Sequence, residues 1–484
     1  MSPHSDYTSI ELFAGAGGFT LGFEEAGFRC LGAIEVDPVA SSTFVKNFGD
    51  RPASLLGPDT GDVRKISAGT IQKHLRGAGV SALDLLVAGA PCQGFSRAGR
   101  AKLESINSRA DSFVVDDRNG LYVHAVRILR DLQPRFFVFE NVSGMLHIRG
   151  RNVAEEVCDA VAEAGYVVRC TLLNAAWYGV PQIRERIIIL GARKDLGVVP
   201  AFPARRFHAA LGRGHLSGGE LDRRNWRKPE YFVDPRQLPS EFPAGPAVTV
   251  SEALDDLPAF RAHLASLQNG HRYRPLRTEF PAVVYAHAPR NWYCLKMRAW
   301  NDEIISSRVV DHFCRWTPRD FETFARMKPG DRYPIAMQIA EERYQDALAW
   351  WRQNGGKYPT RKSYVPPYPV DSFPDKWRKL IPEAPSWTIT AHLGKDTYSH
   401  IHYDPSQARS ITVREAARLQ SFPDAFQFAG NTGDAFRQIG NAVPPLLARE
   451  LGAAVRAVLA RVDGRAERSH VVWNAGWKAM LARP

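Results

Sequence analysis

Short apolar runs alternate with longer segments of helical periodicity in the N-terminal part of this chain. The runs are bounded by Gly, Pro or polar residues, and they are Thr8–Phe13, Cys30–Val36, Leu83–Ala88, Phe136–Phe139, Val167–Leu173 and Ile187–Leu190. Between them, Leu121–Leu132 and Val153–Ala164 each place apolar side chains on one helix face. Strands that alternate with helices predict an α/β fold with a doubly wound parallel sheet. Ligands of such sheets bind beyond the carboxyl ends of the strands, so the residues after each run are the first site candidates.

A glycine-rich turn follows the first run and contains Phe13, Ala14, Gly15, Gly17 and Gly18. Glycines at such a place allow a tight turn and let a ligand approach the backbone before a helix begins. The spacing is not that of a dinucleotide site, because Thr20 stands where the third glycine would be. A turn without any ligand remains the alternative.

Two acidic residues stand in the loops that come next. Glu35 ends the second run, and Asp62 with Val63 follows a short loop. The carboxylate of Glu35 could accept two hydrogen bonds from a ribose diol, and Asp62 could accept one from an adenine amino group. Taken alone, Glu35 also fits a solvated loop acid. Together with the glycine-rich turn, the two acids predict an adenosine-containing cofactor without a pyrophosphate.

One of the six cysteines stands apart from the others. Cys92 lies in a turn after a strand, between Pro91 and Gln93, where backbone N–H groups can favour a thiolate. We therefore take Cys92 as a candidate nucleophile and the other cysteines as structural.

Charged and polar side chains also mark two later strand ends. Glu140 and Asn141 follow an apolar run, and a carboxyl group there either caps the turn or has a raised pKa. Alternation places Gln182, Arg184 and Arg186 on one side of an extended segment. A solvated edge would explain these arginines equally.

The composition excludes several classes of protein. The cysteines show no C-x-x-C spacing, so neither a disulfide framework nor a metal site is predicted. No apolar run approaches the roughly 18 residues that a membrane span needs. The first residues also lack the apolar core of a signal peptide. We therefore expect a cytoplasmic protein that does not enter a membrane.

In their order and combination, these residues resemble the DNA cytosine-5 methyltransferases of the bacterial restriction-modification or orphan type. The similar segments are Phe13–Gly22, Glu35, Asp62, Pro91–Gln93, Arg118–Leu121, Glu140–Val142, Gln182–Arg186, Arg414–Asp424 and Gln438–Pro445. Two positions depart from the family pattern: Glu11 stands where Asp is frequent, and Ala90 stands where a second Pro is frequent. Neither departure removes a group that the chemistry needs.

The resemblance implies a Rossmann-like sheet that binds S-adenosyl-L-methionine as methyl donor. It implies that the cofactor is held by Phe13, Ala14, Gly15, Gly17, Gly18, Glu35, Asp62, Val63, Pro91, Leu121 and Asn441. It also implies that the catalytic residues are Cys92, Glu140, Asn141, Arg184 and Arg186.

The implied chemistry explains why these residue types are needed. The target cytosine is flipped out of the duplex, Cys92 attacks its carbon 6, and carbon 5 then becomes nucleophilic enough to take the methyl group. Glu140 holds or protonates N3, and Arg186 contacts O2 with support from Arg184. Asn141 orders the turn that holds the nucleophile.

Basic charge is concentrated in the middle of the chain. Residues 201–380 contain 29 Lys and Arg against 20 Asp and Glu, which is +9 of the formal net charge of +12, and seven of the eleven tryptophans. Basic residues interleaved with aromatic ones are typical of a DNA-binding surface. Candidate groove contacts are Arg205, Arg206, Arg223, Arg224, Arg227, Arg272, Arg274 and Arg277, although each could instead be a solvated charge.

We therefore expect one catalytic domain that is interrupted by a DNA-reading domain. Residues 1–194 would form the first part of the catalytic domain, 195–435 the basic target-recognition domain and hinge, and 436–484 the returning part and tail. The basic segment Ser96–Asp117 is predicted to close as a loop over the DNA.

The leading interpretation is a sequence-specific DNA cytosine-5 methyltransferase that acts as a monomer on double-stranded DNA at the nucleoid. Its expected partners are a cognate restriction enzyme or defence-system proteins. Two alternatives stay open: an RNA cytosine-5 methyltransferase, and a DNA-binding scaffold without catalysis. The large basic middle region argues against the first, and the presence of Cys92, Glu140 and Arg186 argues against the second.

Overall fold

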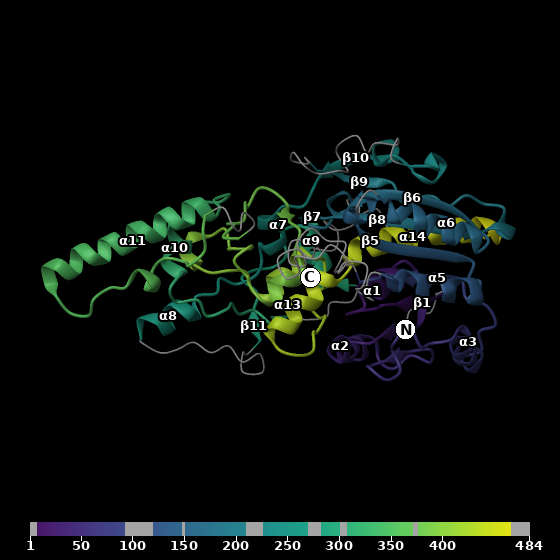
Figure 1. Ribbon diagram of the computed structural model, residues 1–484, viewed down its shortest axis with the longest axis horizontal. Helices are drawn as coiled ribbons and strands as arrows, with labels where there is room; N and C mark the ends of the chain where they lie inside the picture. Colours follow the sequence, from purple (N-terminus) through teal and green to yellow (C-terminus); the bar gives the residue numbers. More distant parts are fainter. Residues whose placement is uncertain are drawn as a thin grey trace. The chain divides into compact units, whose positions relative to one another are not determined.

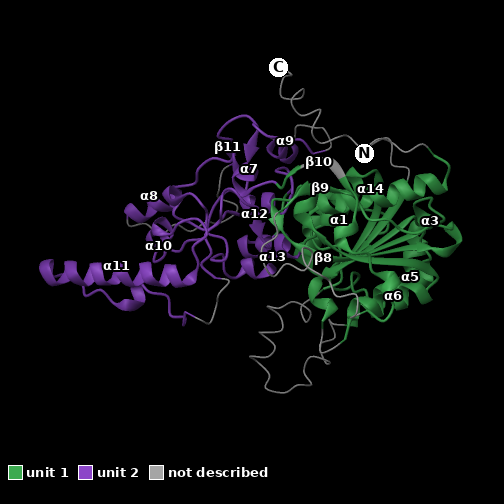
Figure 2. Ribbon diagram, turned by 90° about the horizontal axis from the view of Figure 1, so that it is seen from above, with its two compact units in different colours: residues 1–247, 427–429, 442–472 green, residues 248–426, 430–441, 473–484 purple. Residues whose placement is uncertain are grey.

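The computed structural model describes residues 7–91, 120–147, 151–209, 226–269, 282–300, 307–370 and 376–465 (Figure 1). The chain divides into two compact units, which Figure 2 shows in different colours. Unit 1 comprises Met1–Ala247, Gln427–Ala429 and Ala442–Val472, and unit 2 comprises Val248–Phe426, Gly430–Asn441 and Trp473–Pro484. Each unit is therefore assembled from segments that are far apart in the sequence.

A seven-stranded sheet with the strand order β3-β2-β1-β4-β5-β8-β6 forms the centre of unit 1. Its strands are β1 (Tyr7–Leu12), β2 (Phe28–Glu35), β3 (Leu55–Leu56), β4 (Leu85–Ala88), β5 (Phe136–Val142), β6 (Tyr166–Asn174) and β8 (Glu185–Arg193). The first five of these strands along the chain run parallel to one another. All six predicted strands are present, and the predicted α/β class is confirmed.

One strand of the sheet runs against the predicted parallel direction. β8 is antiparallel to both β5 and β6. The connection from β6 to β8 contains only a 3-10 turn (Ala175–Tyr178) and the short strand β7 (Gln182–Ile183). A parallel pair needs a crossover of a dozen or more residues, and this connection is too short for one.

Helices cover both faces of the sheet. Figure 2 shows α1 and α14 on one face and α5 and α6 on the other. The helices of unit 1 are α1 (Gly18–Glu25), α2 (Pro38–Phe48), α3 (Ala68–Gly77), α5 (Leu121–Leu132), α6 (Val153–Glu163) and α14 (Pro445–Val462). The two helices predicted from periodicity are therefore α5 and α6. Their apolar faces join the buried core of the sheet, as Ile128 and Val157 illustrate.

Short polar side chains fix where two of these helices begin. The carboxylate of Asp37 accepts hydrogen bonds from the N–H groups of Val39 (2.9 Å) and Ala40 (3.0 Å) at the start of α2. The amide oxygen of Asn152 accepts from the N–H of Glu155 (3.2 Å) at the start of α6. Such caps satisfy N–H groups that have no partner within the helix.

The outer edge of β6 is covered by a later segment of unit 1. The N–H of Val233 donates to the carbonyl of Cys170 (2.8 Å), and the Thr171 hydroxyl donates to the carbonyl of Val233 (2.7 Å). The stacked rings of Trp226 and Phe232, 5.3 Å apart, join the core. Unit 1 also contains the parallel pair β9 (Arg205–His208) and β10 (Ser240–Pro246).

Unit 2 consists mainly of helices joined by long irregular segments. Its helices are α7 (Val250–Leu254), α8 (Ala262–Gln268), α9 (Trp292–Arg298), α10 (Phe321–Arg326), α11 (Tyr333–Asn354), α12 (Val413–Leu419) and α13 (Thr432–Asn441). Its strands are the antiparallel pair β11 (Val283–Val284) and β12 (Arg308–Val309), and β13 (Ser386–Trp387). Aromatic residues such as Phe324, Tyr333 and Trp377 form a core of its own.

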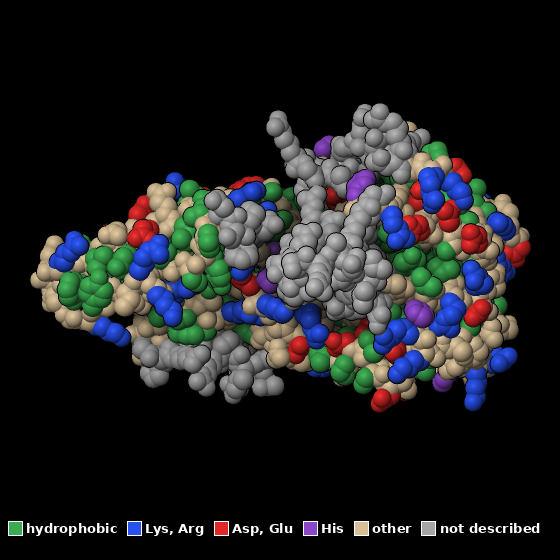
Figure 3. All heavy atoms as spheres, in the orientation of Figure 1, with side chains coloured by type: hydrophobic (Ala, Val, Ile, Leu, Met, Phe, Trp, Pro, Cys, Tyr) green, Lys and Arg blue, Asp and Glu red, His purple; other side chains and the backbone are tan. Residues whose placement is uncertain are grey.

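Charged side chains of both signs lie on the described surface. On the face drawn in Figure 3, Lys and Arg side chains are interspersed with Asp and Glu side chains. Among the residues that the structure describes, no helix has the length and apolar character needed to cross a bilayer.

Candidate active site

The carboxyl ends of three strands lie side by side at one edge of the unit 1 sheet. Leu12 of β1 is in register with Ala88 of β4, and Ala88 is in register with Phe139 of β5. The turns after these strands therefore meet at this edge. Two of these turns are the glycine-rich turn and the turn that leads to Pro91, and Glu140 lies in the last residues of β5 at the same edge.

The glycines of the first turn serve two different purposes. A β-carbon at Gly18 would lie 2.3 Å from the carbonyl oxygen of Val443, so the absence of a side chain lets the segment before α14 pack against the turn. Gly15 has a φ of +55°, and a β-carbon there would meet no described atom within 4 Å. Open space beside a backbone in this conformation is suited to a ligand. The packing role of Gly18 could not be read from the sequence.

Glu35 holds the glycine-rich turn in place. One of its carboxylate oxygens accepts a hydrogen bond from the N–H of Gly15 (2.8 Å), and the other accepts from the N–H of Asp37 (2.7 Å). Burial raises the pKa of Glu35, although these N–H groups oppose the shift. Glu35 is therefore a structural part of the turn and not a freely solvated acid.

Glu11 contributes a second buried acid that the sequence did not single out as functional. One of its oxygens accepts hydrogen bonds from the backbone N–H (2.9 Å) and the hydroxyl (2.6 Å) of Thr20, in the first turn of α1. Burial raises the pKa of Glu11 to about 8, and the nearby charge of Glu35 adds to the shift. The sequence signal was an acid inside an apolar run, at a position where the similar family frequently has Asp.

Asp62 is held by an arginine two residues later. The guanidinium of Arg64 donates to both carboxylate oxygens, with Nε 2.9 Å from Oδ1 and NH2 2.8 Å from Oδ2. These hydrogen bonds lower the pKa of Asp62, against the effect of burial. Any adenine contact by Asp62 would share the carboxylate with Arg64.

Glu140 and Arg186 form an ion pair at the strand ends. Oε1 of Glu140 lies 2.7 Å from Nε of Arg186, and both side chains are largely buried. Burial raises the pKa of Glu140, while the charges of Arg186 and Arg184 partly offset that shift. The pair belongs to β5 and β8, which are adjacent and antiparallel, with Val142 opposite Arg186.

Arg184 is buried and points to a different partner. Its NH2 donates to the carbonyl of Ala442 (3.0 Å), in the segment just before α14. Its own N–H donates to the amide oxygen of Asn174 (3.4 Å), which also accepts from the N–H of Ala176 (3.1 Å). Arg184 therefore ties the start of β8 to a segment more than 250 residues later in the chain.

Asn141 lies beside the turn that leads to the predicted nucleophile. Its side-chain amide donates to the carbonyl of Ala90 (3.2 Å), and its amide oxygen accepts from the N–H of Val142 (2.9 Å). Pro91 is the last described residue before a gap, and Cys92 lies outside the described residues. The predicted loop Ser96–Asp117 lies in the same undescribed segment.

The remaining predicted cofactor residues have different surroundings. Phe13 and Leu121 are partly buried against the core of the sheet, and Val63 and Ala14 are buried. Asn441 ends α13, is exposed and belongs to unit 2.

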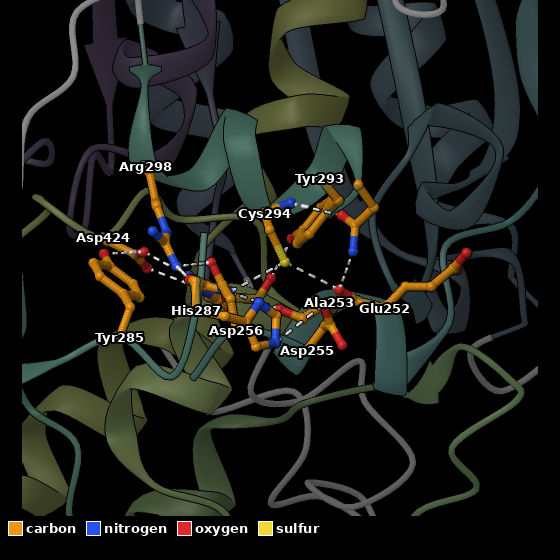
Figure 4. Close-up of polar contacts among 12 residues, drawn as sticks. Glu252, Ala253, Asp255, Asp256, Tyr285, His287, Tyr293, Cys294, Arg298 and Asp424 are labelled. Atoms are coloured by element: carbon orange, nitrogen blue, oxygen red, sulfur yellow. Dashed lines mark hydrogen bonds and ion pairs between the residues drawn. The ribbon is translucent and has the colours of Figure 1, made fainter. Parts of the chain in front are cut away.

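The predicted motif at Arg414–Asp424 is buried within unit 2, and Figure 4 shows the polar contacts around its last residue, Asp424. Nε and NH2 of Arg418 lie 2.9 and 2.7 Å from the two carboxylate oxygens of Asp424, and NH1 contacts Asp256. Asp256 also pairs with Arg298, at 2.5 Å. Burial would raise the pKa of Asp424, but the charge and hydrogen bonds of Arg418 outweigh it and lower the pKa.

Three of the predicted groove arginines are described, and all three make contacts within unit 1. Nε of Arg206 lies 3.0 Å from Glu450, and Arg205 lies over the ring of Trp177, 5.5 Å from its centroid. Arg227 lies within 3.4 Å of two acids of α6, at the edge of unit 1. The predicted contacts at Arg223, Arg224, Arg272, Arg274 and Arg277 lie outside the described residues.

Comparison with known proteins gives one family. A family model described as C-5 cytosine-specific DNA methylase matches residues 7–237 and 303–457, which is more than half of the chain. A candidate type II methyltransferase of Oceanobacillus iheyensis, M.OihORF3336P, is 36% identical over 91% of this chain and 94% of its own length. The type II methyltransferase M.AgeI of Thalassovita gelatinovora is 30% identical over 92% of this chain and 97% of its own length.

A solved structure shares the fold. It is a candidate DNA modification methyltransferase encoded within an E. coli prophage, with a TM-score of 0.60 and 21% sequence identity. The likeness covers 94% of this chain and 99% of that one.

Proposed function

Since this chain belongs to the C-5 cytosine-specific DNA methylases, we propose that it carries out its chemistry at the strand-end edge of unit 1, around Glu140 and Arg186. The chain is a sequence-specific DNA cytosine-5 methyltransferase. The observation that carries the assignment of the site is a buried acid with a raised pKa, 2.7 Å from an arginine, beside the turn that leads to Cys92. Perturbed acids at strand ends are frequent in active sites.

We assign covalent catalysis to Cys92. Its thiolate forms a bond to carbon 6 of the flipped cytosine, and the electron pair displaced from the ring makes carbon 5 nucleophilic. After carbon 5 has gained its methyl group, it loses its proton to a base and the bond between sulfur and carbon 6 breaks. The contact from Asn141 to the carbonyl of Ala90 supports this role, because it fixes the backbone two residues before Cys92.

Glu140 and Arg186 are assigned to the base itself. Attack at carbon 6 places negative charge on the ring, and a proton held at N3 stabilises that charge. Because its pKa is raised by burial, Glu140 takes up a proton more readily than an ordinary carboxyl group, as this role requires. Arg186 is assigned to O2 of the base, and Arg184 is a positioning residue because its guanidinium is committed to the carbonyl of Ala442.

S-adenosyl-L-methionine supplies the methyl group when it is bound, and we assign its site to the glycine-rich turn. The open space at Gly15 fits a ligand that lies against the backbone. Each carboxylate oxygen of Glu35 accepts one backbone hydrogen bond and has a further lone pair for a ribose hydroxyl. The other predicted contacts of the cofactor, among them Asp62, Leu121 and Asn441, remain part of this proposal.

We assign the reading of the DNA sequence to the middle of the chain. The proposed division is residues 1–194 and 436–484 for catalysis and 195–435 for target recognition and hinge. The concentration of basic charge and tryptophan between 201 and 380 supports it, as does the separate packing core of unit 2. The proposed substrate is double-stranded DNA. Its target cytosine must leave the base stack for the chemistry to occur.

We further infer that the enzyme acts as a monomer on DNA in the cytoplasm, at the nucleoid. A cognate restriction enzyme or a defence-system protein is the proposed functional partner. The type II names of the relatives support the proposal of a restriction enzyme as partner.

Bisulfite sequencing of genomic DNA from a methylation-free host that expresses the protein tests the assignment. We expect one recurrent sequence in which a cytosine is protected. Unmodified DNA together with methylated RNA cytosine would instead support the RNA alternative. If neither is modified although the soluble protein binds DNA, the scaffold alternative would stand.

The substitution Cys92→Ala tests the nucleophile within the same host. We expect complete loss of cytosine protection, because the alanine side chain cannot form the bond to carbon 6, with DNA binding retained. Cys158→Ala is the matched control, since Cys158 is buried in α6 against the sheet and has no assigned chemical role. Methylation by Cys92→Ala would overturn the covalent mechanism.

A further inference from the structure

The outer end of α11 carries exposed aromatic side chains. Trp350 is 62% exposed, and Tyr358, in the segment that follows the helix, is 53% exposed. Figures 1 and 2 show α11 extending beyond the other helices of unit 2, and Figure 3 shows hydrophobic side chains gathered at its outer end. We name residues 350–363 the α11 tip. Grouped exposed aromatic residues are typical of a binding surface.

The α11 tip has a defined internal structure. The ring N–H of Trp351 donates to the carbonyl of Gly356 (3.2 Å), and its ring meets that of Tyr358 edge-on at 5.0 Å. Arg361 donates to Glu341 of α11 (2.9 Å), which ties the returning segment back to the helix. Trp350 therefore lies next to a segment that is held in place by its own contacts.

The charge of the tip is of one sign. Residues 350–363 include Arg352, Lys357, Arg361 and Lys362, and they include no Asp or Glu. Arg361 is partly neutralised by Glu341, whereas the other three basic side chains are exposed. Exposed basic residues next to aromatic ones suit a polyanion more than an apolar protein surface.

The length of α11 sets how far along a duplex the tip can reach from the rest of unit 2. Tyr333, at the start of the helix, is buried in the core of unit 2. The helix has 22 residues, and at 1.5 Å per residue it is ~33 Å long. This is close to one turn of duplex DNA, about 34–36 Å. With α11 lying along the duplex, the tip would therefore face DNA about one turn away from the DNA beside the start of the helix.

We propose that the α11 tip binds the phosphate backbone of duplex DNA outside the recognition sequence. The proposal rests on the proposed function, because it assumes that unit 2 binds DNA, and it adds a contact that reads no bases. Arg352, Lys357 and Lys362 neutralise phosphates, and Trp350 packs against the sugar–phosphate surface. Such contacts raise affinity and fix the position of the enzyme without changing its sequence preference.

The test compares duplexes of increasing length that all contain the sequence recognised by the enzyme. The variant is Arg352→Ala with Lys357→Ala, and the control is Lys73→Ala with Arg76→Ala, which removes the same two charge types from exposed positions of α3 in unit 1. On long duplexes we expect the first variant to bind roughly tenfold more weakly. The slope of log affinity against log salt should fall by about 1.8, that is about 0.9 for each phosphate that the variant leaves without a basic side chain.

On a duplex trimmed to the recognition sequence alone, wild type and variant should bind with equal affinity. The methylation rate at saturating DNA should also be equal for both. Trp350→Ala should weaken binding on long duplexes only, whereas Ile335→Ala, which removes another exposed apolar side chain of α11, should not. Because all these side chains are exposed, the melting temperature serves as a check that each variant is folded.

Equal affinity and equal salt dependence of wild type and variant on long duplexes would overturn the proposal. If Trp350→Ala instead changed the mass of the protein in solution, the tip would be a contact between copies of the chain. Failure of the wild type to methylate any DNA would overturn the proposed function itself, so the two failures are distinguishable.

Discussion

Each unit contains a buried cluster of arginine and carboxylate groups, and the two clusters differ in how completely their charges are paired. In unit 2, Arg418 pairs with both oxygens of Asp424 and also contacts Asp256. In unit 1, Oε1 of Glu140 lies 2.7 Å from Nε of Arg186, and the charge of Arg184 also acts on Glu140. Both clusters are buried, so burial alone cannot explain how they differ.

The pKa values of the two acids move in opposite directions. Burial raises the pKa of Glu140, and Arg186 and Arg184 offset only part of that shift. For Asp424, the charge and hydrogen bonds of Arg418 exceed the effect of burial, and the pKa is lowered. A lowered pKa favours the ionised form of an acid, which suits a permanent ion pair with an arginine. An acid with a raised pKa can carry a proton, which is what chemistry on a base requires.

Glu140→Gln tests whether the acid of the unit 1 cluster is catalytic. Its effect on the methylation rate should be the largest of those predicted. The amide keeps the size of the side chain but cannot exchange a proton with N3. We expect the methylation rate on saturating DNA to fall by about 10²–10⁴-fold, the usual contribution of a general acid. A single-turnover assay of methyl incorporation measures this loss.

The control for Glu140→Gln is the stability of the variant. Because the amide oxygen of Gln can still accept a hydrogen bond from Arg186, and Arg186 keeps its hydrogen bond to the carbonyl of Glu185, the loss of stability should stay well below the roughly 3–5 kcal/mol of a fully broken buried pair. Loss of activity with a clear loss of stability would show that Glu140 is a structural partner of Arg186. The contrast between the two clusters would then be wrong.

Arg418→Leu tests the structural side of the comparison. It leaves Asp424 and Asp256 buried without their common cation, and breaking such a pair usually costs about 3–5 kcal/mol. We expect the free energy of unfolding, measured in urea, to fall by about this amount. DNA binding should be lost together with the folded state of unit 2.

Arg361→Ala is the matched control for Arg418→Leu. Arg361 also pairs with a carboxylate, that of Glu341, but both side chains are exposed. Exposed pairs contribute about 0–1 kcal/mol, so this variant should be close to wild type in stability. Equal losses from both variants would mean that burial does not set the strength of these pairs.

The sheet could be predicted from the sequence because its signals are local. An apolar run and the residue that follows it are neighbours in the chain, so the strand ends and Glu35, Glu140 and Asn141 were found together. The antiparallel direction of β8 was missed, because the prediction did not weigh the length of its connection to β6. The placement of Arg184 against Ala442 could not be found from either segment alone.

The clusters themselves depend on contacts that are remote in sequence. Asp256 and Arg418 are 162 residues apart, and no local pattern marks Asp256. Arg205 and Arg206 were predicted to contact DNA from their charge, yet Arg206 pairs with Glu450 at the far end of the chain. Charge density therefore predicts a binding region, whereas the partner of a single arginine is set by the fold.

Glu11 extends the comparison to a buried acid whose hydrogen-bond partner is Thr20 and not an arginine. Burial raises its pKa from the ordinary 4.5 to about 8. Between these values the unfolded chain releases the proton and the folded chain keeps it, so stability is highest at low pH and is lost as the pH rises through this window.

Glu11→Gln removes the effect. The unfolding free energy of wild type relative to this variant should therefore fall by about 3.5 kcal/mol from pH 5 to pH 8. A difference that is constant with pH would mean that folded Glu11 is ionised throughout, and that burial without an arginine does not suffice to hold a proton in this unit.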